Sequence, residues 1–322
     1  MCRDFMNISY LEMLTANLDP TPFVLKIREV RRIMSMFTNW YEIIPVVFHL
    51  RKRANLSLRS GATIPIYSLY DLQRMVSESA EYRIALMPQL KIHMTQYDIL
   101  FNYMGKHIRL YHGGDHRRMM HALGAISEIF VDDVYGKLWL RGQTIVDIGA
   151  NIGDSVIYFA AKGAKNIIAF EPFRSSFYIM RKNININRIN NVKLINNAVL
   201  DKTKIIKIPN NGTYSSTVNS RGNTPTKVTT LKEITDNYDI TDGVLKIDTE
   251  GAEYDIILSQ ANDTLRKYRQ IMIEYHYGYK NLEEKLKDAG FNVSHTRPKR
   301  ISSNAMYIGM LSAERRKTEV KH

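Results

Sequence analysis

Two acidic residues follow β-branched runs in the middle of the chain, and their spacing suits the binding of a nucleoside. The run that begins at Thr144 reaches Asp147, and Gly149 and Gly153 follow before an amphipathic segment. This order predicts a strand, a tight turn and a helix, which form the ligand-binding corner of an α/β sheet. A second run ends in Glu171. In nucleoside-binding folds, an acid about 20 residues further on accepts hydrogen bonds from ribose hydroxyls.

The charge of the turn indicates which nucleoside it binds. Dinucleotide sites use a G-x-G-x-x-G turn that brings backbone amides to a pyrophosphate, whereas this turn has the spacing G-x-x-x-G and carries Asp147. A carboxylate repels a pyrophosphate and attracts the ammonium and sulfonium groups of S-adenosylmethionine, which has a ribose diol and no phosphate. We therefore predict an S-adenosylmethionine site and no NAD binding, with Asp147 at the methionine end and Glu171 at the ribose. The other predicted contacts in the turn are Gly149, Asn151 and Gly153. The alternative is a turn whose glycines serve packing alone.

A third strand is predicted over 192–195, and the residues after it are candidates for the adenine site. Asn197 and Ala198 combine a polar edge with a small side chain, which suits a base, although the two asparagines at 196 and 197 could instead form a turn. Residues 209–225 lack periodicity and are polar, which predicts a loop. Because long polar loops in compact domains commonly cover ligands, we expect this loop to act as a lid.

Four further polar residues lie at the ends of the predicted fourth and fifth strands, over 244–248 and 271–276. Asp248 and Glu250 follow the fourth strand, and Glu274 and His276 end the fifth. If the two strands are neighbours, these four side chains meet at the carboxyl edge, where open α/β sheets bind ligands. Glu253 is interpreted only as an acid in the first turn of a helix that begins at Gly251, where it favours the helix dipole.

The four residues are predicted to act on the group that accepts the methyl of the cofactor. His276 is the best candidate for a general base from its unperturbed pKa, and Asp248 or Glu250 is the rival if burial raises its pKa. Asp248, Glu274 and His276 could instead hold a divalent cation that acidifies the acceptor group. We favour the metal-free alternative, because the ligand set depends on the assumed adjacency of the strands.

Composition is that of a protein with a sizeable core and no disulfide framework. The chain has 322 residues, 44% of them hydrophobic, and Cys2 is its one cysteine, which predicts neither an intrachain disulfide nor a thiolate metal cluster. We find no apolar run of the length needed to cross a bilayer. The N-terminus also lacks the basic-then-apolar order of a signal peptide. We therefore expect a cytoplasmic protein without a transmembrane segment.

The basic excess of the chain lies in its flanks. The net charge is +13, and basic clusters occur at 51–53, 297–300 and 315–317. Such clusters can contact an anionic membrane surface, a nucleic acid or a phosphorylated glycan, but we favour the interpretation that they are solvated basic faces. Hairpin and helix patterns before residue 120 predict an α+β accessory or cap domain over 1–120. Alternating strand and helix patterns predict the main domain over 121–313, followed by a basic tail over 314–322.

Taken together, these segments resemble the FkbM-type family of S-adenosylmethionine-dependent methyltransferases. The matching segments are Val146–Gly153, Phe170–Pro172, Val228–Leu231, Leu245–Glu253 and Ile273–His276. Within them, the Lys-Ile-Asp-x-Glu-Gly-x-Glu string is the most specific, with Thr249 where the family commonly has valine. The resemblance implies the seven-stranded, Rossmann-like class I sheet with an antiparallel last strand, expected at 306–310 after a strand at 291–293.

The resemblance also implies O-methylation, commonly of a sugar or natural-product hydroxyl, so the expected partner is a glycan or small molecule. The alternative is an RNA methyltransferase that uses the basic flanks. Against it, the fourth strand ends in Asp-Thr-Glu-Gly and lacks the Asn/Asp-Pro-Pro-aromatic string of base-amino methylation. A non-catalytic binding module is a third possibility, which the intact set of acidic residues disfavours.

Overall fold

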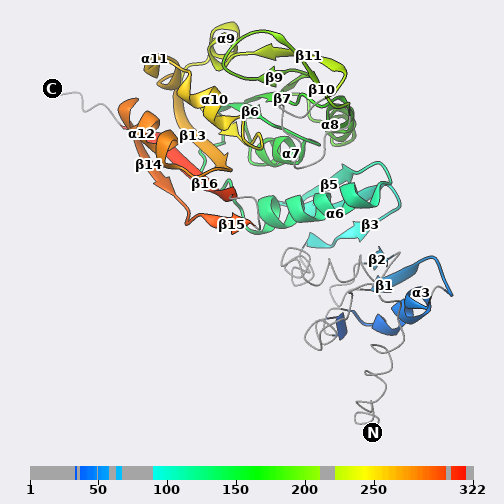
Figure 1. Ribbon diagram of the computed structural model, residues 1–322. Helices are drawn as coiled ribbons and strands as arrows, with labels where there is room; N and C mark the ends of the chain where they lie inside the picture. Colours follow the sequence, from blue (N-terminus) through cyan, green and yellow to red (C-terminus); the bar gives the residue numbers. More distant parts are fainter. Residues whose placement is uncertain are drawn as a thin grey trace. The chain divides into compact units, whose positions relative to one another are not determined.

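The computed structural model describes residues 33–34, 37–48, 50–57, 63–66, 90–210, 222–301 and 306–316 (Figure 1). The chain divides into two compact units. The first contains Met1–Thr95 with Leu100–Asn102, and the second contains Gln96–Ile99 with Tyr103–His322. This boundary lies ahead of residue 120. The separation of a cap domain from a catalytic domain at 120 stays a prediction.

The first unit contains short elements only. A 3-10 helix η1 (Trp40–Ile43) leads into α3 (Ile44–Val47), and β1 (Ala54–Ser57) pairs antiparallel with β2 (Thr63–Ile66). The strand β3 spans His93–Met94. The hairpin expected from the strand patterns around residue 60 is thus present.

The second unit is built on a seven-stranded sheet. In sheet order, its strands are β8 (Val192–Ile195), β7 (Asn166–Phe170), β6 (Thr144–Ile148), β12 (Gly243–Ile247), β13 (Tyr268–Tyr275), β16 (Met306–Arg315) and β14 (Phe291–His295). The first five are parallel to one another, whereas β16 is antiparallel to both of its neighbours. This arrangement confirms the predicted class I fold, with its antiparallel strand, and places β6 beside β12 at the point where the strand order reverses.

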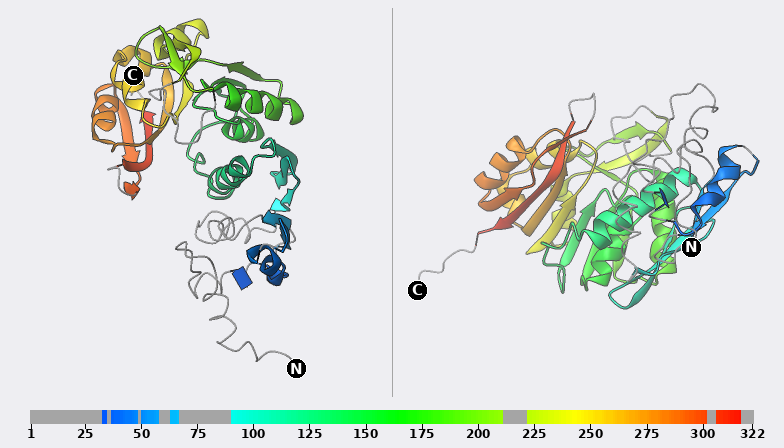
Figure 2. Two further views of the ribbon diagram at one scale, coloured as in Figure 1. Left: turned by 45° about the vertical axis from the view of Figure 1, so that its right-hand side comes forward. Right: turned by 90° about the horizontal axis from the view of Figure 1, so that it is seen from below.

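Helices cover both faces of this sheet, which explains why its central strands read as continuous apolar runs rather than alternating ones. One group contains α6 (His116–Ala125), a π-helical segment η3 (Ile126–Val131), α7 (Asp154–Ala161) and α8 (Arg174–Ile186), with α7 packed on η3 and α8. The other contains α9 (Leu231–Asn237), α10 (Glu253–Leu258), α11 (Asn262–Leu265) and α12 (Lys280–Asp288) (Figures 1 and 2). Within this group, α11 packs on α9 and α12, and α12 packs on α10.

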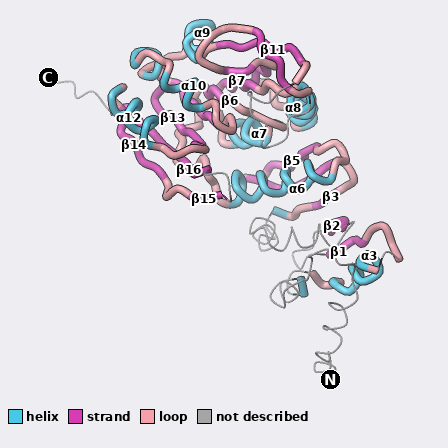
Figure 3. The backbone as a smooth tube through the Cα atoms, in the orientation of Figure 1, coloured by secondary structure: helices cyan, strands magenta, loops and turns pink. Residues whose placement is uncertain are grey.

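Smaller strands complete the second unit. β9 (Ala198–Val199), β10 (Ile205–Ile208) and β11 (Thr224–Thr229) form a three-stranded sheet, and β15 (Lys299–Ile301) pairs with β16. β4 (Asp98–Tyr103), whose residues are divided between the two units, and β5 (Lys106–Tyr111) are joined by a tight turn at Met104 and Gly105. Both turn residues have positive φ, as primed hairpin turns require. Figure 3 shows β5 as a magenta strand.

Two expectations need correction or lie outside the described residues. The loop predicted over 209–225 ends earlier, because Thr224 and Pro225 already belong to β11. Most of the proposed lid, residues 211–221, lies outside the described residues. The helix expected to begin at Gly251 begins two residues later at Glu253, since Glu250 and Gly251 both have positive φ.

Aromatic side chains fix α7 against η3 at the base of the site. Tyr158 on α7 packs edge-to-face against Phe130 and Tyr135, with ring centroids 5.8 and 5.9 Å apart. The hydroxyl of Tyr158 donates a hydrogen bond of 2.5 Å to Asp133. These contacts hold the helix that follows the glycine turn, and with it the turn itself.

Candidate active site

The first cluster lies where β6 and β12 run side by side. Lys246 and Asp147 are register partners on these strands, and Lys246 Nζ lies 3.0 Å from Asp147 Oδ1. Nζ also donates to the carbonyl oxygen of Gly149 at 2.9 Å, and Ser155 Oγ donates to Asp147 Oδ2 at 2.6 Å. The Lys246 and Asp147 side chains are both almost fully buried. Asp147, predicted to face the methionine end, is therefore already neutralised by a lysine of the neighbouring strand.

Lys246 is the cation of a largely acidic site. Burial lowers its pKa, but the charges of Asp147 and Asp248 outweigh that effect and raise the pKa above its ordinary value. Asp248 Oδ2 lies 3.9 Å from Nζ. Burial raises the pKa of Asp154, the first residue of α7, to about 6, although the nearby charge of Lys246 opposes the increase. The positive charge of Lys246 thus interacts with Asp147, Asp248 and Asp154.

The glycines of the turn are required by the protein backbone. Gly149 has φ +81°, and a Cβ there would lie 1.7 Å from the carbonyl oxygen of Asp248. Gly153 has φ +88°, and its Cβ would lie 3.0 Å from Met180 on α8. Between them, Asn151 has φ +46°. Packing alone therefore accounts for both glycines, and their predicted contacts with a cofactor stay predictions.

Glu171 lies directly after β7 and is buried, as a ribose-binding acid would be. Its Oε2 accepts the backbone N–H of Asn151 and its Oε1 accepts that of Phe173, both at 2.9 Å. Burial raises the pKa of Glu171 to about 7, although the two backbone hydrogen bonds lower it. A carboxylate can accept about four hydrogen bonds, so each oxygen keeps capacity for a further donor. Two such donors are what a ribose diol presents.

The residues after β8 were predicted either to contact adenine or to form a turn. Asn196 Nδ2 donates to the carbonyl oxygens of Glu171 and Pro172, at 2.8 and 3.0 Å, so this side chain braces the neighbouring strand end. Ala198 is buried at the start of β9, where it pairs with Val228. Asn197 is half-buried between them. Contacts of Asn197 and Ala198 with adenine stay predictions.

The second cluster combines residues from the ends of β12 and β13. These two strands are adjacent and parallel, so the side chains at their ends lie close together. Asp248 and Glu250 follow β12, and His276 follows β13. His276 Nε2 lies 3.4 Å from Glu250 Oε2. The structure thus brings together three of the four residues predicted for the acceptor site, and the fourth, Glu274, joins them electrostatically.

Glu253 is the member of this cluster that sequence reasoning missed. It lies in the first turn of α10, as expected, but it is fully buried. Its Oε1 lies 3.0 Å from both the backbone nitrogen and Nδ1 of His276. Its Oε2 accepts hydrogen bonds from Gly251 N at 2.8 Å and Thr249 Oγ1 at 3.1 Å. A helix-dipole role explains none of these contacts. The available signal was the second glutamate of the Glu-Gly-x-Glu string.

The pKa values of the cluster differ from those assumed for isolated side chains. Desolvation lowers the pKa of His276, but the hydrogen bond and charge of Glu253, with the charges of Glu250 and Asp248, raise it to about 9. Burial raises the pKa of Glu250 to about 7, although the charge of His276 opposes this. At neutral pH, His276 is therefore a cation between two glutamates, and Glu250 is poised to gain or lose a proton.

Further acidic groups surround Asp248. Burial and the charges of Asp248 and Glu128 raise the pKa of Glu274 well above its usual range. Glu128, on η3, is exposed, yet packing around its carboxyl and the charge of Asp248 raise its pKa as well. Glu128 lies outside the sequence motifs, so sequence reasoning did not identify it as a site residue. Its segment is a π-helix, an element often found at functional sites.

The same cluster has the composition of a cation site. Ligand atoms of Asp248, Glu250 and His276 lie within 4.8 Å of one another. Glu250 thus takes the place that the sequence-based alternative gave to Glu274. Glu253, bonded to His276 Nδ1, corresponds to the carboxylate that commonly orients a metal-binding histidine. A histidine ligand must be neutral, so a cation at this site would displace the proton of His276 and its affinity would rise with pH.

Comparison with known proteins gives a family match over part of the chain. Residues 147–293 match the family model described as the methyltransferase FkbM domain. No curated protein matches the chain significantly in sequence. In the described part of the chain, no helix is long and apolar enough to cross a membrane.

Several solved structures are similar to the chain at low identity. TYW2 of M. jannaschii in complex with AdoMet has 17% identity, covers 69% of this chain and 88% of its own, and has a TM-score of 0.39. TrmK of M. capricolum with S-adenosyl-homocysteine has 14% identity, coverages of 58% and 67%, and a TM-score of 0.39. Precorrin-6y C5,15-methyltransferase of Geobacter metallireducens has 16% identity, coverages of 57% and 87%, and a TM-score of 0.35.

Residues 147–293 form an S-adenosylmethionine-dependent methyltransferase domain of the FkbM type. The residues present fit the cofactor at one well-defined point, since the buried carboxyl of Glu171 keeps acceptor capacity at the end of β7.

Proposed function

We propose that this methyltransferase transfers the methyl group to a hydroxyl oxygen, of a sugar, a glycan or a small natural product. The observation that supports this most is the contact chain from Glu253 through His276 to Glu250, at 3.0 and 3.4 Å. A hydroxyl is a weak nucleophile until a base accepts its proton. The contacts between Glu253, His276 and Glu250 provide a base whose pKa lies near neutrality. An amine acceptor needs no such arrangement when it is already neutral.

Glu250 is proposed as the base, the alternative that the sequence left open beside His276. With a pKa of about 9, His276 is protonated at neutral pH and cannot accept a proton. Glu250, with a pKa of about 7, is ionised in a large fraction of molecules and regains a proton readily. His276 then acts as a fixed cation that orients the Glu250 carboxylate, and Glu253 acts as a positioning residue through His276.

S-adenosylmethionine, when bound, supplies an electrophilic methyl group on its sulfonium sulfur. Glu250 takes the proton of the acceptor hydroxyl as the acceptor oxygen gains that methyl group. Asp248 and Glu274 line the same strand ends and are proposed to orient the acceptor through its other hydroxyls. Glu171 is proposed to hold the ribose, while Asp147 acts through Lys246 rather than as a free charge.

A labelled methyl group tests the proposal directly. The protein would be incubated with methyl-labelled S-adenosylmethionine and separate fractions of glycans, lipids, small metabolites and total RNA, and the labelled product would be identified by mass spectrometry. We expect methoxyl groups in the glycan or small-molecule fraction. Label found only in RNA would support the alternative function suggested by the basic flanks, and label on nitrogen would contradict the proposed chemistry.

Variants then test the assigned base. Glu250→Gln should lower turnover by about 10²-fold or more while cofactor affinity stays nearly unchanged. Glu284→Gln, on the exposed face of α12, makes the same chemical change away from the site and serves as the control. Activity in excess EDTA should persist. Activity that is lost in EDTA and restored by a divalent ion would instead support a metal bound by Asp248, Glu250 and His276. The proposed cytoplasmic location needs a separate localisation experiment.

A further inference from the structure

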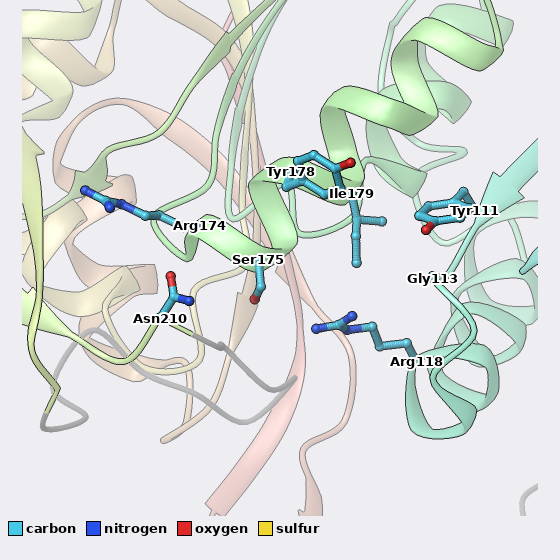
Figure 4. A pocket seen from close by; sticks show the side chains of 8 residues that line it. All are labelled: Tyr111, Gly113, Arg118, Arg174, Ser175, Tyr178, Ile179 and Asn210. Atoms are coloured by element: carbon cyan, nitrogen blue, oxygen red, sulfur yellow. The ribbon is translucent and has the colours of Figure 1, made fainter.

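A pocket outside the acidic site has the opposite charge and chemistry. It has a volume of about 320 Å³ and lies where the start of α8 faces the end of β5 and the first turn of α6. Its lining residues are Tyr111, Gly113, Arg118, Arg174, Ser175, Tyr178, Ile179 and Asn210, shown in Figure 4. None of them is acidic, whereas the neighbouring methyl-transfer site is lined by carboxylates.

Among the described residues, the Arg118 guanidinium and the Ser175 hydroxyl of this pocket have no hydrogen-bond partner. Arg118 extends its guanidinium toward Ser175, whose hydroxyl points into the space between Arg118 and Asn210 (Figure 4). Ser175 Oγ is a buried atom without a hydrogen-bond partner among the described residues. Neither Arg118 nor Arg174 forms an ion pair with any residue that the structure describes. Because the buried Ser175 hydroxyl and the partly buried Arg118 guanidinium have no partner among the described residues, both can form hydrogen bonds with a ligand.

The pocket wall is held in place by buried hydrogen bonds. Asn183 on α8 accepts the backbone N–H of Tyr111 at 2.6 Å and donates to its carbonyl oxygen at 3.2 Å. Four residues further along the sequence, Asn187 likewise accepts the backbone N–H of Arg109 at 3.0 Å and donates to its carbonyl oxygen at 2.7 Å. The strand that carries Tyr111 is thus fastened to the helix that carries Ser175. The two sides of the pocket keep a defined separation without a ligand.

Electrostatics around the pocket favour an anion. The first residues of α8 have no side-chain cap, so the positive end of a 13-residue helix faces the same space. Lys182 stacks on Tyr111, with Nζ 3.5 Å from the ring centroid, and adds positive charge behind that wall. A planar guanidinium with a hydroxyl beside it matches the several oxygens of a phosphate group.

We propose that this pocket binds a phosphate ester, with the phosphate between Arg118 and Ser175. Tyr178 supplies the contact for the carbon part of the ligand, because its large side chain is 63% exposed at the rim of the pocket. The exposed ring offers a flat apolar surface to a sugar or similar ring. The pocket is therefore a binding site additional to the cofactor and acceptor sites, and its test does not depend on methyl transfer.

Titration calorimetry with three probes tests the proposal: inorganic phosphate, glucose 6-phosphate and glucose. We expect glucose 6-phosphate to bind more tightly than inorganic phosphate, and glucose to show no binding. Arg118→Gln should weaken phosphate binding by about tenfold or more, as expected for a lost charge-assisted hydrogen bond. Arg117→Gln, the exposed neighbour on α6, removes the same charge outside the pocket and should leave the affinity unchanged. Tyr178→Ala should abolish the preference for the ester.

The outcomes separate the site from general electrostatics. Equal weakening by Arg117→Gln and Arg118→Gln would overturn the pocket as the binding site. Absence of binding by both phosphate probes, or equally tight binding of glucose, would overturn the anion proposal. Equal affinities for inorganic phosphate and glucose 6-phosphate would overturn the assignment of an ester and leave a site for free phosphate. Retained binding of S-adenosylmethionine shows that each variant is folded.

Discussion

The substitution Glu253→Gln tests whether a fully buried glutamate sets the charge of His276. Glu253 Oε1 lies 3.0 Å from His276 Nδ1, and the carboxylate is the first of the groups that raise the histidine pKa. Desolvation acts in the opposite direction, so neighbouring negative charges must supply the whole increase. Glutamine keeps the size and one acceptor oxygen of the side chain but removes its charge.

The expected size of the effect follows from the pKa values. An increase from 6.5 to about 9 corresponds to about 3 kcal/mol at 1.36 kcal/mol per pKa unit. An opposite charge at this separation accounts for about 1–3 units. We therefore expect the pKa of His276 to fall by about that amount in Glu253→Gln.

The same change has a defined sign for stability. Because the folded pKa of His276 lies above the unfolded one, its stabilising contribution is complete below about pH 6.5 and is lost as the pH rises through about 9. The difference in unfolding free energy between the wild type and Glu253→Gln should therefore shrink across that interval. Side-chain NMR titration of His276 and urea unfolding at several pH values measure the two effects.

The control is Glu284→Gln, an exposed substitution of the same type on α12. It should leave both the titration of His276 and the stability profile unchanged. The reasoning is refuted if a folded Glu253→Gln protein shows an unaltered His276 pKa, or if its stability stays at a constant offset from the wild type between about pH 6 and about pH 9.5.

Three further predictions concern the cofactor corner. Glu171→Ala should weaken S-adenosylmethionine binding by about 1.5–3 kcal/mol, measured by calorimetry. In the wild type, affinity should rise with pH through about 7 as this carboxyl ionises. Gly149→Ala should lower the free energy of unfolding by more than Gly142→Ala does. Both glycines have positive φ, but only a Cβ added at Gly149 would clash with backbone, 1.7 Å from the carbonyl oxygen of Asp248. Lys246→Met should cost about 3–5 kcal/mol in urea unfolding, since Asp147 would remain buried without its partner; a smaller loss would contradict the ion pair.

The strands of the sheet could be anticipated because each has a recognisable pattern in its own segment, whereas their order in the sheet was only implied by the family resemblance. Runs such as 144–148 and 243–247 are mostly apolar, with one charged residue each, and both of these strands are buried almost throughout. Parallel strands joined by helices then place all strand ends at one edge. The positions of Asp248, Glu250 and His276 at that edge followed from the same pattern. The exact start of α10 did not, because left-handed conformations at Glu250 and Gly251 depend on what surrounds them.

The roles of individual side chains needed the tertiary structure. Asp147 and Lys246 are 99 residues apart in sequence, and only strand pairing shows that they neutralise each other. Glu253 reads as a helix-dipole acid until β13 brings His276 against it. The phosphate pocket draws on β5, α6 and α8 and has no contiguous motif.

The sequence by itself determined the strands, their acidic ends and the resemblance to the FkbM methyltransferases, because these depend on periodicity and short motifs within single segments. Tertiary structure decided the protonation states and partners of those acids. A pKa depends on burial and on charges a few ångströms away, and those charges come from segments that are distant in the chain.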